Sequence, residues 1–249
     1  MYKLIERSFF KDAPIYEGNE NLVVETSKNK DGALFNKSLT FAKQINRSWI
    51  KSDLTKKISI EGLTRLNAVY FDNISKMTNK KIKYNQTTFN YMMLSNSDHE
   101  HSMNLNVYDA IIDAVDSGHA LIPHNRKFYY DPHQKKFHPI FYDGAGGSYR
   151  RYLLEGWKSK IIKLDKEQIN FKWGISKNSI KGASRAIKEI EKINIKKFSL
   201  ELKSKGLNFN EKMVRDLFAT ISHNLSIISK FENSKNKDDY FINLNDYLA

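Results

Sequence analysis

The chain has no cysteine and only four prolines among its 249 residues. Without cysteine it can form no disulfide framework, no thiolate zinc site and no thiol nucleophile. It also has no run of about 18 apolar residues, so the sequence predicts no transmembrane helix. The first residues lack an apolar stretch followed by a small-residue cleavage site, so they are not typical of a signal peptide. From these absences we expect a cytoplasmic protein.

Positive charge is what the sequence has in excess, with 41 Lys and Arg against 28 Asp and Glu and a net charge of +13. Such a charge suits a polyanion, such as nucleic acid, an anionic membrane or an acidic protein. The lysines are spread along the whole chain, however, as an A/T-rich coding sequence would also produce. The excess therefore favours a phosphate-bearing ligand or an acidic protein substrate, while nucleic acid stays open as a partner.

Apolar periodicity predicts a mostly helical α+β chain. Residues 13–25 are expected to form a loop with a short strand at 22–24. We expect Gly118 to end a helix as a C-cap glycine and Asn210 to begin one as an N-cap. The expected helices cover residues 1–10, 33–50, 59–77, 86–94, 104–116, 149–164, 179–204 and 210–230.

The pattern changes between Gly118 and Gly147, where two aromatic-rich runs, KFYYD and KFHPIFYD, flank a turn that contains proline. This arrangement predicts a β-hairpin. Pro139, inside the second run, cannot donate a ladder hydrogen bond, so that run is expected to be an edge strand or to carry a bulge. Asn125 at the start and Asp143 at the end of the hairpin would then lie side by side. Amide and carboxylate oxygens so placed are how kinase-like enzymes hold the magnesium of ATP.

This segment, PHNRKFYYDP…KKFHPIFYDG, resembles the CotH-like kinases, an atypical kinase family named for a spore-coat protein. A weaker resemblance covers IERSFFKDAPIYEGNE, where Glu6 would be the helix glutamate that pairs with an ATP-binding lysine. The resemblance implies Mg²⁺ and ATP as cofactors, Asn125 and Asp143 as metal ligands, and a protein hydroxyl as phosphoryl acceptor. It also implies a kinase-like C-lobe over residues 1–165, lacking most of an N-lobe, with a helical C-terminal extension over 166–249.

The sequence departs from the family pattern at the catalytic base. Kinases usually place a catalytic aspartate five residues before the metal-binding asparagine, and here that position is Ala120. Nearby substitutes are His119, Asp116 and His124. A histidine can act as a base because its pKa lies close to neutral pH. Among the three, His119 is the first candidate because it is nearest to the usual position.

A second departure concerns the nucleotide-binding lobe, because only five residues precede Glu6. A glycine-rich loop and a lysine strand would lie upstream of it, so we expect a truncated or inactive relative. Basic residues flank the hairpin and suit phosphate oxygens, with Arg126 and Arg150 as the candidates for the cofactor. Lys127 and Arg151 lie beside them.

Three alternatives remain open. The run from Asp98 to His101, Asp-His-Glu-His, is either a metal-binding cluster or a solvated polar loop. A metal-dependent nuclease of the His-Asn-His type could draw on His119 or His124, Asn125, and His133 or His138. The mixed basic and aromatic runs would also suit a nucleic-acid-binding module without catalytic activity.

Overall fold

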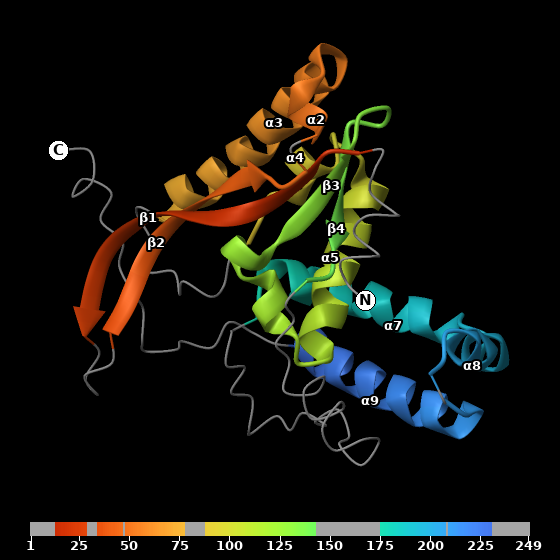
Figure 1. Cartoon of the computed structure of the whole chain (residues 1–249). Coiled ribbons are helices and arrows are strands. Elements are labelled where there is room, and N and C mark those ends of the chain that lie inside the picture. The colour runs from red at the N-terminus through yellow and green to blue at the C-terminus, as the bar shows by residue number, and fades with distance from the viewer. Residues whose placement is uncertain are drawn as a thin grey trace. The chain divides into compact units, whose positions relative to one another are not determined.

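The computed structural model describes residues 13–28, 34–46, 48–77, 88–142, 175–207 and 209–230, with only the backbone at 19–28, 34–39 and 74–77. These residues form an α+β fold (Figure 1), as predicted, and divide into two compact units. The sheet unit holds the described residues up to Ser102 together with 122–142. The helical unit holds Met103–Leu121 and the described residues from 175 onward. No helix in the described part of the chain is long and apolar enough to cross a membrane.

The sheet has four antiparallel strands in the order β2-β1-β3-β4. Strand β1 (Ile15–Lys28) pairs along its length with β2 (Leu34–Gln44), and its first three residues also pair with β3 (Lys127–Asp131). Strand β4 (Lys136–Ile140) pairs with β3 and forms the edge, as Pro139 predicted. The predicted hairpin is therefore confirmed, and it is joined to the sheet through β1.

Two predictions for the start of the chain were wrong. The short strand expected at 22–24 lies within β1, but β1 begins at Ile15 and includes most of the expected loop. Residues 34–44 of the helix expected at 33–50 form β2. Burial in β2 alternates, with Thr40 and Ala42 buried and Lys43 exposed, which is the period of a strand. The apolar spacing in this region also fits a helix, and the ladder between β1 and β2 decides the outcome. Only Ser48–Lys51, at the end of the expected helix, is helical, as α2.

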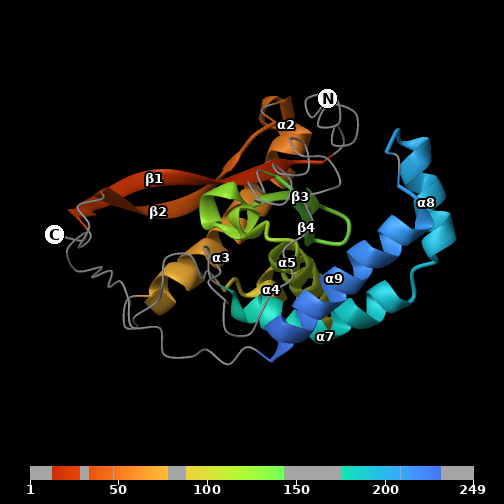
Figure 2. The same cartoon turned by 90° about the horizontal axis from the view of Figure 1, so that it is seen from below.

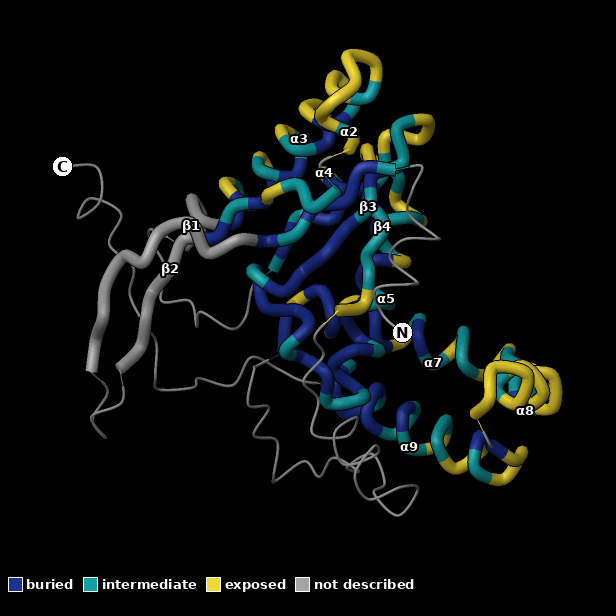
Figure 3. The backbone as a smooth tube through the Cα atoms, in the orientation of Figure 1, coloured by how far each residue is buried: buried dark blue, intermediate teal, exposed yellow. Residues whose placement is uncertain are grey.

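Helix α3 (Asp53–Met77) packs on the sheet and begins six residues before the predicted start at Ser59. Its inner face buries Leu66, Val69 and Tyr70, as the apolar spacing predicted. The hydroxyl of Tyr16 on β1 donates a hydrogen bond of 2.8 Å to the backbone carbonyl of Ser59. Figure 3 shows the buried backbone of this region in dark blue. These contacts place the sheet's aromatic face against the helix.

The short helix expected at 86–94 is present as α4 (Tyr91–Leu94), while residues 86 and 87 lie outside the described residues. Helix α5 (His99–Ala114) follows and confirms the helix expected at 104–116, with an earlier start. The carboxylate of Asp98 accepts a 3.0 Å hydrogen bond from the backbone N–H of His101, which is how an N-cap acts. The run from Asp98 to His101 is therefore a helix start rather than a loop.

The end of α5 is closed by Asp116, so the expected C-cap role of Gly118 was wrong. Asp116 has a φ of 56°, the left-handed conformation that closes many helices. Its N–H donates to the carbonyl of Asp113 at 3.0 Å, and the N–H of Ser117 donates to the carbonyl of Ile112 at 2.9 Å. Gly118 instead begins the 3₁₀-helix η1 (Gly118–Leu121).

The helical unit contains α7 (Lys177–Glu191), α8 (Ile195–Ser204) and α9 (Glu211–Ser229). The single helix expected at 179–204 was wrong because Asn194 interrupts it. The Asn194 side chain accepts a 3.0 Å hydrogen bond from the N–H of Lys197 and begins α8. The predicted cap at Asn210 is confirmed by its 2.9 Å hydrogen bond from the N–H of Met213. The core of this unit contains Ala110, Ala114, Ile175, Ala183, Ala186, Ile221, Leu225 and Ile228.

The helices predicted at residues 1–10 and 149–164 lie outside the described residues. The boundary expected at residue 165, between a kinase-like region and a helical extension, lies outside them too.

Candidate functional site

The register of the β3–β4 hairpin fixes which residues share an end. Lys127 pairs with Ile140 at one end, and Asp131 pairs with Lys136 at the other. Asn125 precedes β3 by two residues, so it lies at the end where the chain leaves β4. We call this end the hairpin base. The sequence predicted that the start and the end of the hairpin would meet, and the register confirms it.

A cation–π contact closes the hairpin base. The Lys127 ammonium lies 3.2 Å from the centre of the Tyr142 ring. Such contacts are strongest when the cation is shielded from water, and Lys127 is only 7% exposed. Tyr142 immediately precedes Asp143 in the sequence, and Lys127 follows Asn125 by two residues. The contact therefore brings the neighbours of the proposed metal ligands together, although Asp143 itself lies outside the described residues.

Strand β1 adds a carboxylate to the hairpin base. Glu17 pairs with Lys127 in the β1–β3 ladder, and its carboxylate lies 3.5 Å from the Lys127 ammonium. It also lies 3.0 Å from the ammonium of Lys43 on β2. A buried ammonium is costly unless it is paired, so Glu17 explains how the sheet tolerates Lys127. We refer to Glu17, Asn125, Lys127 and Tyr142 as the base cluster.

The loop that carries Asn125 is fixed from two sides. Asn125 ends the 3₁₀-helix η2 (Pro123–Asn125), is 8% exposed, and donates its N–H to the carbonyl of Ile122 at 2.9 Å. The Tyr70 hydroxyl on α3 donates a 2.8 Å hydrogen bond to the carbonyl of Pro123. On the other side Gly18 is required, because a Cβ there would overlap the same Pro123 carbonyl. The position of Asn125 is thus set by β1 and α3 together.

Arg126 is buried inside the sheet unit. Its guanidinium donates a 2.6 Å hydrogen bond to the hydroxyl of Tyr91 and lies 4.7 Å from the centre of the Phe89 ring. Its backbone carbonyl accepts a 3.0 Å hydrogen bond from the N–H of Gly18. Only 3% of the residue is exposed. These contacts give Arg126 a structural role in the loop, and its expected contact with the cofactor stays a prediction.

The remaining predicted residues are distributed between the two units. His124 is half-buried on η2, in the same turn as Asn125. His119 is half-buried on η1 of the helical unit, where Asp116 closes α5. Ala120, at the position where kinases usually place the catalytic aspartate, is buried. Three predicted residues lie outside the described residues, namely Glu6, Asp143 and Arg150.

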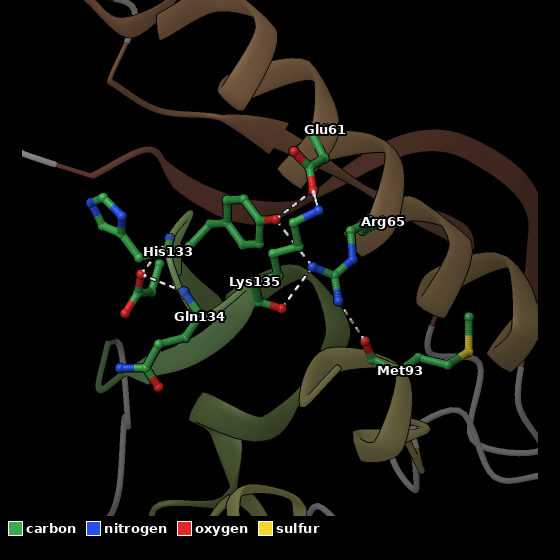
Figure 4. A network of polar contacts seen from close by, with 8 residues as sticks. Glu61, Arg65, Met93, His133, Gln134 and Lys135 are labelled. Atoms are coloured by element: carbon green, nitrogen blue, oxygen red, sulfur yellow. Dashed lines mark hydrogen bonds and ion pairs between the residues drawn. The ribbon is translucent and has the colours of Figure 1, made fainter. Parts of the chain in front are cut away.

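The opposite end of the hairpin is held by a polar network from α3 (Figure 4). The Arg65 guanidinium donates to the carbonyl of Lys135 at 2.6 Å, to the Tyr130 hydroxyl at 3.1 Å and to the carbonyl of Met93 at 3.3 Å. The Tyr130 hydroxyl in turn donates to the Glu61 carboxylate at 2.9 Å. The hairpin is therefore attached to α3 near its turn as well as near its base.

The residues required by a His-Asn-His site are not gathered in one place. His133 is exposed in the hairpin turn, where its N–H donates to the carboxylate of Asp131 at 2.8 Å. Asn125 lies at the opposite end of the hairpin. His138, in the middle of β4, stacks on Tyr129 with ring centres 4.6 Å apart. The hairpin thus separates His133 from Asn125 by the length of its strands.

A pair of histidines forms a second polar feature of the sheet unit. The rings of His101 and His138 meet edge to face with centres 4.8 Å apart, and the His101 Nε2–H donates to the carbonyl of Phe137 at 2.8 Å. Burial lowers the pKa of His138, and the nearby His101 lowers it further. His138 is therefore held in its neutral form more strongly than an ordinary histidine.

The described residues contain no group of three His, Asp or Glu side chains placed to hold a metal ion. The hard oxygen ligands that the sequence predicts for Mg²⁺ are Asn125, which is described, and Asp143, which is not.

The sequence did not predict the roles of Glu17 and Tyr142 in the base cluster. Glu17 lies in the N-terminal segment that resembles the family, but only the register of the strands shows that it meets Lys127. Comparison of the chain with protein-family models, curated proteins and solved structures finds no match.

Proposed function

We propose that this chain is a CotH-like kinase relative that binds Mg-ATP at the hairpin base and transfers phosphate to a protein hydroxyl. The fold would correspond to the C-lobe of an atypical protein kinase. The observation that carries the proposal is the contact between Lys127 and Tyr142, because it brings the neighbours of Asn125 and Asp143 together. Phosphoryl transfer needs mainly this kind of placement of charge and ligands.

The chemistry of the base cluster fits the proposal. Asn125 and Asp143 supply the neutral and anionic oxygens that Mg²⁺ prefers, and bound Mg²⁺ would neutralise phosphate charge. Lys127 keeps a cation at the hairpin base, held by Glu17 at 3.5 Å. His124, in the same turn as Asn125, is a candidate base in the sheet unit. His119 and Asp116, which belong to the helical unit, stay predictions from the sequence.

Nucleotide binding by the purified chain tests the proposal. A fluorescent ATP analogue is titrated with and without Mg²⁺ against the wild-type chain and the variant Asp143→Asn. We expect Mg²⁺-dependent binding that Asp143→Asn weakens by at least about tenfold, because the substitution removes the anionic metal ligand. Transfer of the γ-phosphate to a mixed protein acceptor, such as casein, is measured on the same samples.

Asp131→Asn is the matched control, because it makes the same chemical change at the opposite end of the hairpin. An amide can still accept the turn hydrogen bonds that Asp131 now receives from His133 and Gln134. The control should therefore bind Mg-ATP as the wild type does. Absence of nucleotide binding, or equal binding by Asp143→Asn and the wild type, contradicts the proposal. Strong, salt-sensitive DNA binding without nucleotide binding would instead favour a nucleic-acid-binding module.

A further inference from the structure

Within the described residues, the contacts of helix α8 with the helical unit lie along one face. The rings of Phe198 on α8 and Phe218 on α9 lie 5.2 Å apart. The Ser199 hydroxyl, which is buried, donates a 2.9 Å hydrogen bond to the carbonyl of Phe209. Within this unit α8 lies at one end of the α7–α9 pair (Figure 2), and most of its tube is coloured as exposed in Figure 3. The opposite face of α8 is therefore open.

An apolar side chain occupies the middle of this open face. Leu200 is 58% exposed, and Leu207, just past the end of the helix, is 43% exposed. The side chains three or four positions from a residue are its neighbours on a helix surface, and here three of them are lysines. The exposed lysines of α8 and its end are Lys196, Lys197, Lys203 and Lys205.

The charge of this face is not neutralised locally. Within the part of the chain that the structure describes, none of these four lysines has an ion pair. Glu201 is the acidic residue that α8 itself contains. By contrast, Lys192, just before α8, is paired with Glu189 at 2.9 Å. The open face of α8 is thus an exposed leucine between unpaired lysines.

We propose that the open face of α8 binds an anionic phospholipid surface. A helix that lies in the membrane interface places apolar side chains among the acyl chains, while flanking lysines extend toward the phosphates. Leu200 with lysines on both sides has this arrangement, and the positive charge matches an anionic leaflet. The proposal does not depend on the kinase assignment.

Helix α7 provides a matched control in the same unit. Lys177, Lys181 and Lys188 are exposed, as is Ser184 between them. These lysines lie seven and three positions before Ser184 and four positions after it, so they surround it much as the α8 lysines surround Leu200. Converting three lysines to glutamate on either helix changes the net charge equally. Only the α8 change affects lysines that surround an exposed leucine.

Co-sedimentation of the full chain with vesicles tests the proposal. The vesicles contain phosphatidylcholine alone or phosphatidylcholine with phosphatidylserine. We expect binding only to the anionic vesicles.

The variant Lys196→Glu/Lys197→Glu/Lys203→Glu should weaken vesicle binding by roughly a hundredfold or more, since each lysine near an anionic surface favours binding. Leu200→Ser should weaken it about fivefold through lost apolar burial, without a change of charge. The α7 variant Lys177→Glu/Lys181→Glu/Lys188→Glu should lose less than about tenfold.

Several results would overturn the proposal. These are no binding by the wild type, equal binding to uncharged vesicles, unchanged binding by the α8 variants, or equal loss in the α7 and α8 variants. Capture of the chain by polyglutamate through α8, without vesicle binding, would instead assign this face to an acidic protein. Circular dichroism and thermal unfolding of each variant ensure that a loss reflects the surface and not the fold.

Discussion

In the sheet unit a partly exposed polar network joins α3 to the hairpin, whereas in the helical unit α5 and α7 meet at a close backbone approach, beside buried hydrogen bonds from Ser179 to Asp113 and from Asn224 to Ala114. Tyr130, Glu61 and Arg65 connect β3 with α3 through hydrogen bonds of 2.9 and 3.1 Å. In the helical unit, buried alanines line the helices, and a Cβ at Gly182 on α7 would overlap the backbone of Asn106 on α5. A polar network can lose one hydrogen bond and keep the others. A close approach to backbone leaves no room for an added side chain unless the backbone moves.

Among the described residues, each unit has a glycine whose Cβ would overlap a backbone carbonyl, so substitutions of these glycines should have the largest effects. In Gly182→Ala the new methyl meets the Asn106 carbonyl, and in Gly18→Ala it meets the Pro123 carbonyl. Each is expected to lower the free energy of unfolding by about 3 kcal/mol, because backbone must move to make room. Urea unfolding measures the loss.

Hydrogen exchange shows where each glycine substitution acts. Gly182→Ala should speed amide exchange in α5 and α7, and Gly18→Ala should speed it in β1 and η2. Gly206→Ala tests the opposite situation, because the structure places no atom within 4 Å of a Cβ there, although φ is +79°. Its loss of about 1 kcal/mol should come from backbone strain alone. A loss for Gly206→Ala equal to that for Gly182→Ala would contradict the importance of close approach.

The Arg65 network should yield the next largest effect. Arg65→Ala removes hydrogen bonds to Lys135, Tyr130 and Met93 and the stacking of the guanidinium on Tyr130. Because the group is partly exposed, we expect a loss of about 2 kcal/mol in the free energy of unfolding. Arg65→Lys keeps the charge but not the forked donors, and should recover less than half of the loss. Full recovery by lysine would show that charge alone holds the hairpin to α3.

The two units also differ in how far the sequence predicted them. The N-cap at Asn210 and the hairpin around its proline turn depend on local sequence signals, and both predictions were confirmed. Strand β2, and β1 apart from the short strand expected at 22–24, were missed because their pairing joins residues up to 28 positions apart, as for Tyr16 and Gln44. Local spacing in that region fits a helix equally well, so only the ladder distinguishes the two. Tertiary pairing overrode local preference there.

The candidate site shows the same limit. Asn125 could be proposed from the hairpin's sequence, because the start and end of a hairpin must meet. Glu17 could not, since its contact with Lys127 depends on the register between β1 and β3. The requirement for Gly18 also follows from the approach of the Pro123 carbonyl, which no sequence pattern contains. Chemistry carried by one segment was predictable, and chemistry shared between segments was not.

Helix caps in the helical unit should have a moderate and local effect. Asn194→Ala removes the acceptor for the Lys197 N–H, which lies 3.0 Å away, and should cost about 1 kcal/mol. Asn194→Asp keeps an acceptor at the same position and should restore stability. Hydrogen exchange should increase in α8 and little elsewhere. If Asn194→Ala leaves α8 protected, the break at residues 192–194 is fixed by packing rather than by the cap.

The smallest effect concerns the cap of α5 in the sheet unit, which is coupled to pH. The hydrogen bond of 2.6 Å from the Lys136 ammonium, together with the cap bond from His101, lowers the pKa of Asp98 to about 2. Because the pKa is lower in the folded protein than in the unfolded chain, the stabilisation is present above about pH 4 and lost as the pH falls toward about 2. Asp98→Asn keeps an acceptor for His101 but carries no charge, so it should slightly reduce the dependence of stability on pH.

The measurement is the urea midpoint between about pH 4 and about pH 2, with Lys136→Met as the control for the partner residue. If neither variant changes the slope, the exposed pair stabilises neither β4 nor the start of α5.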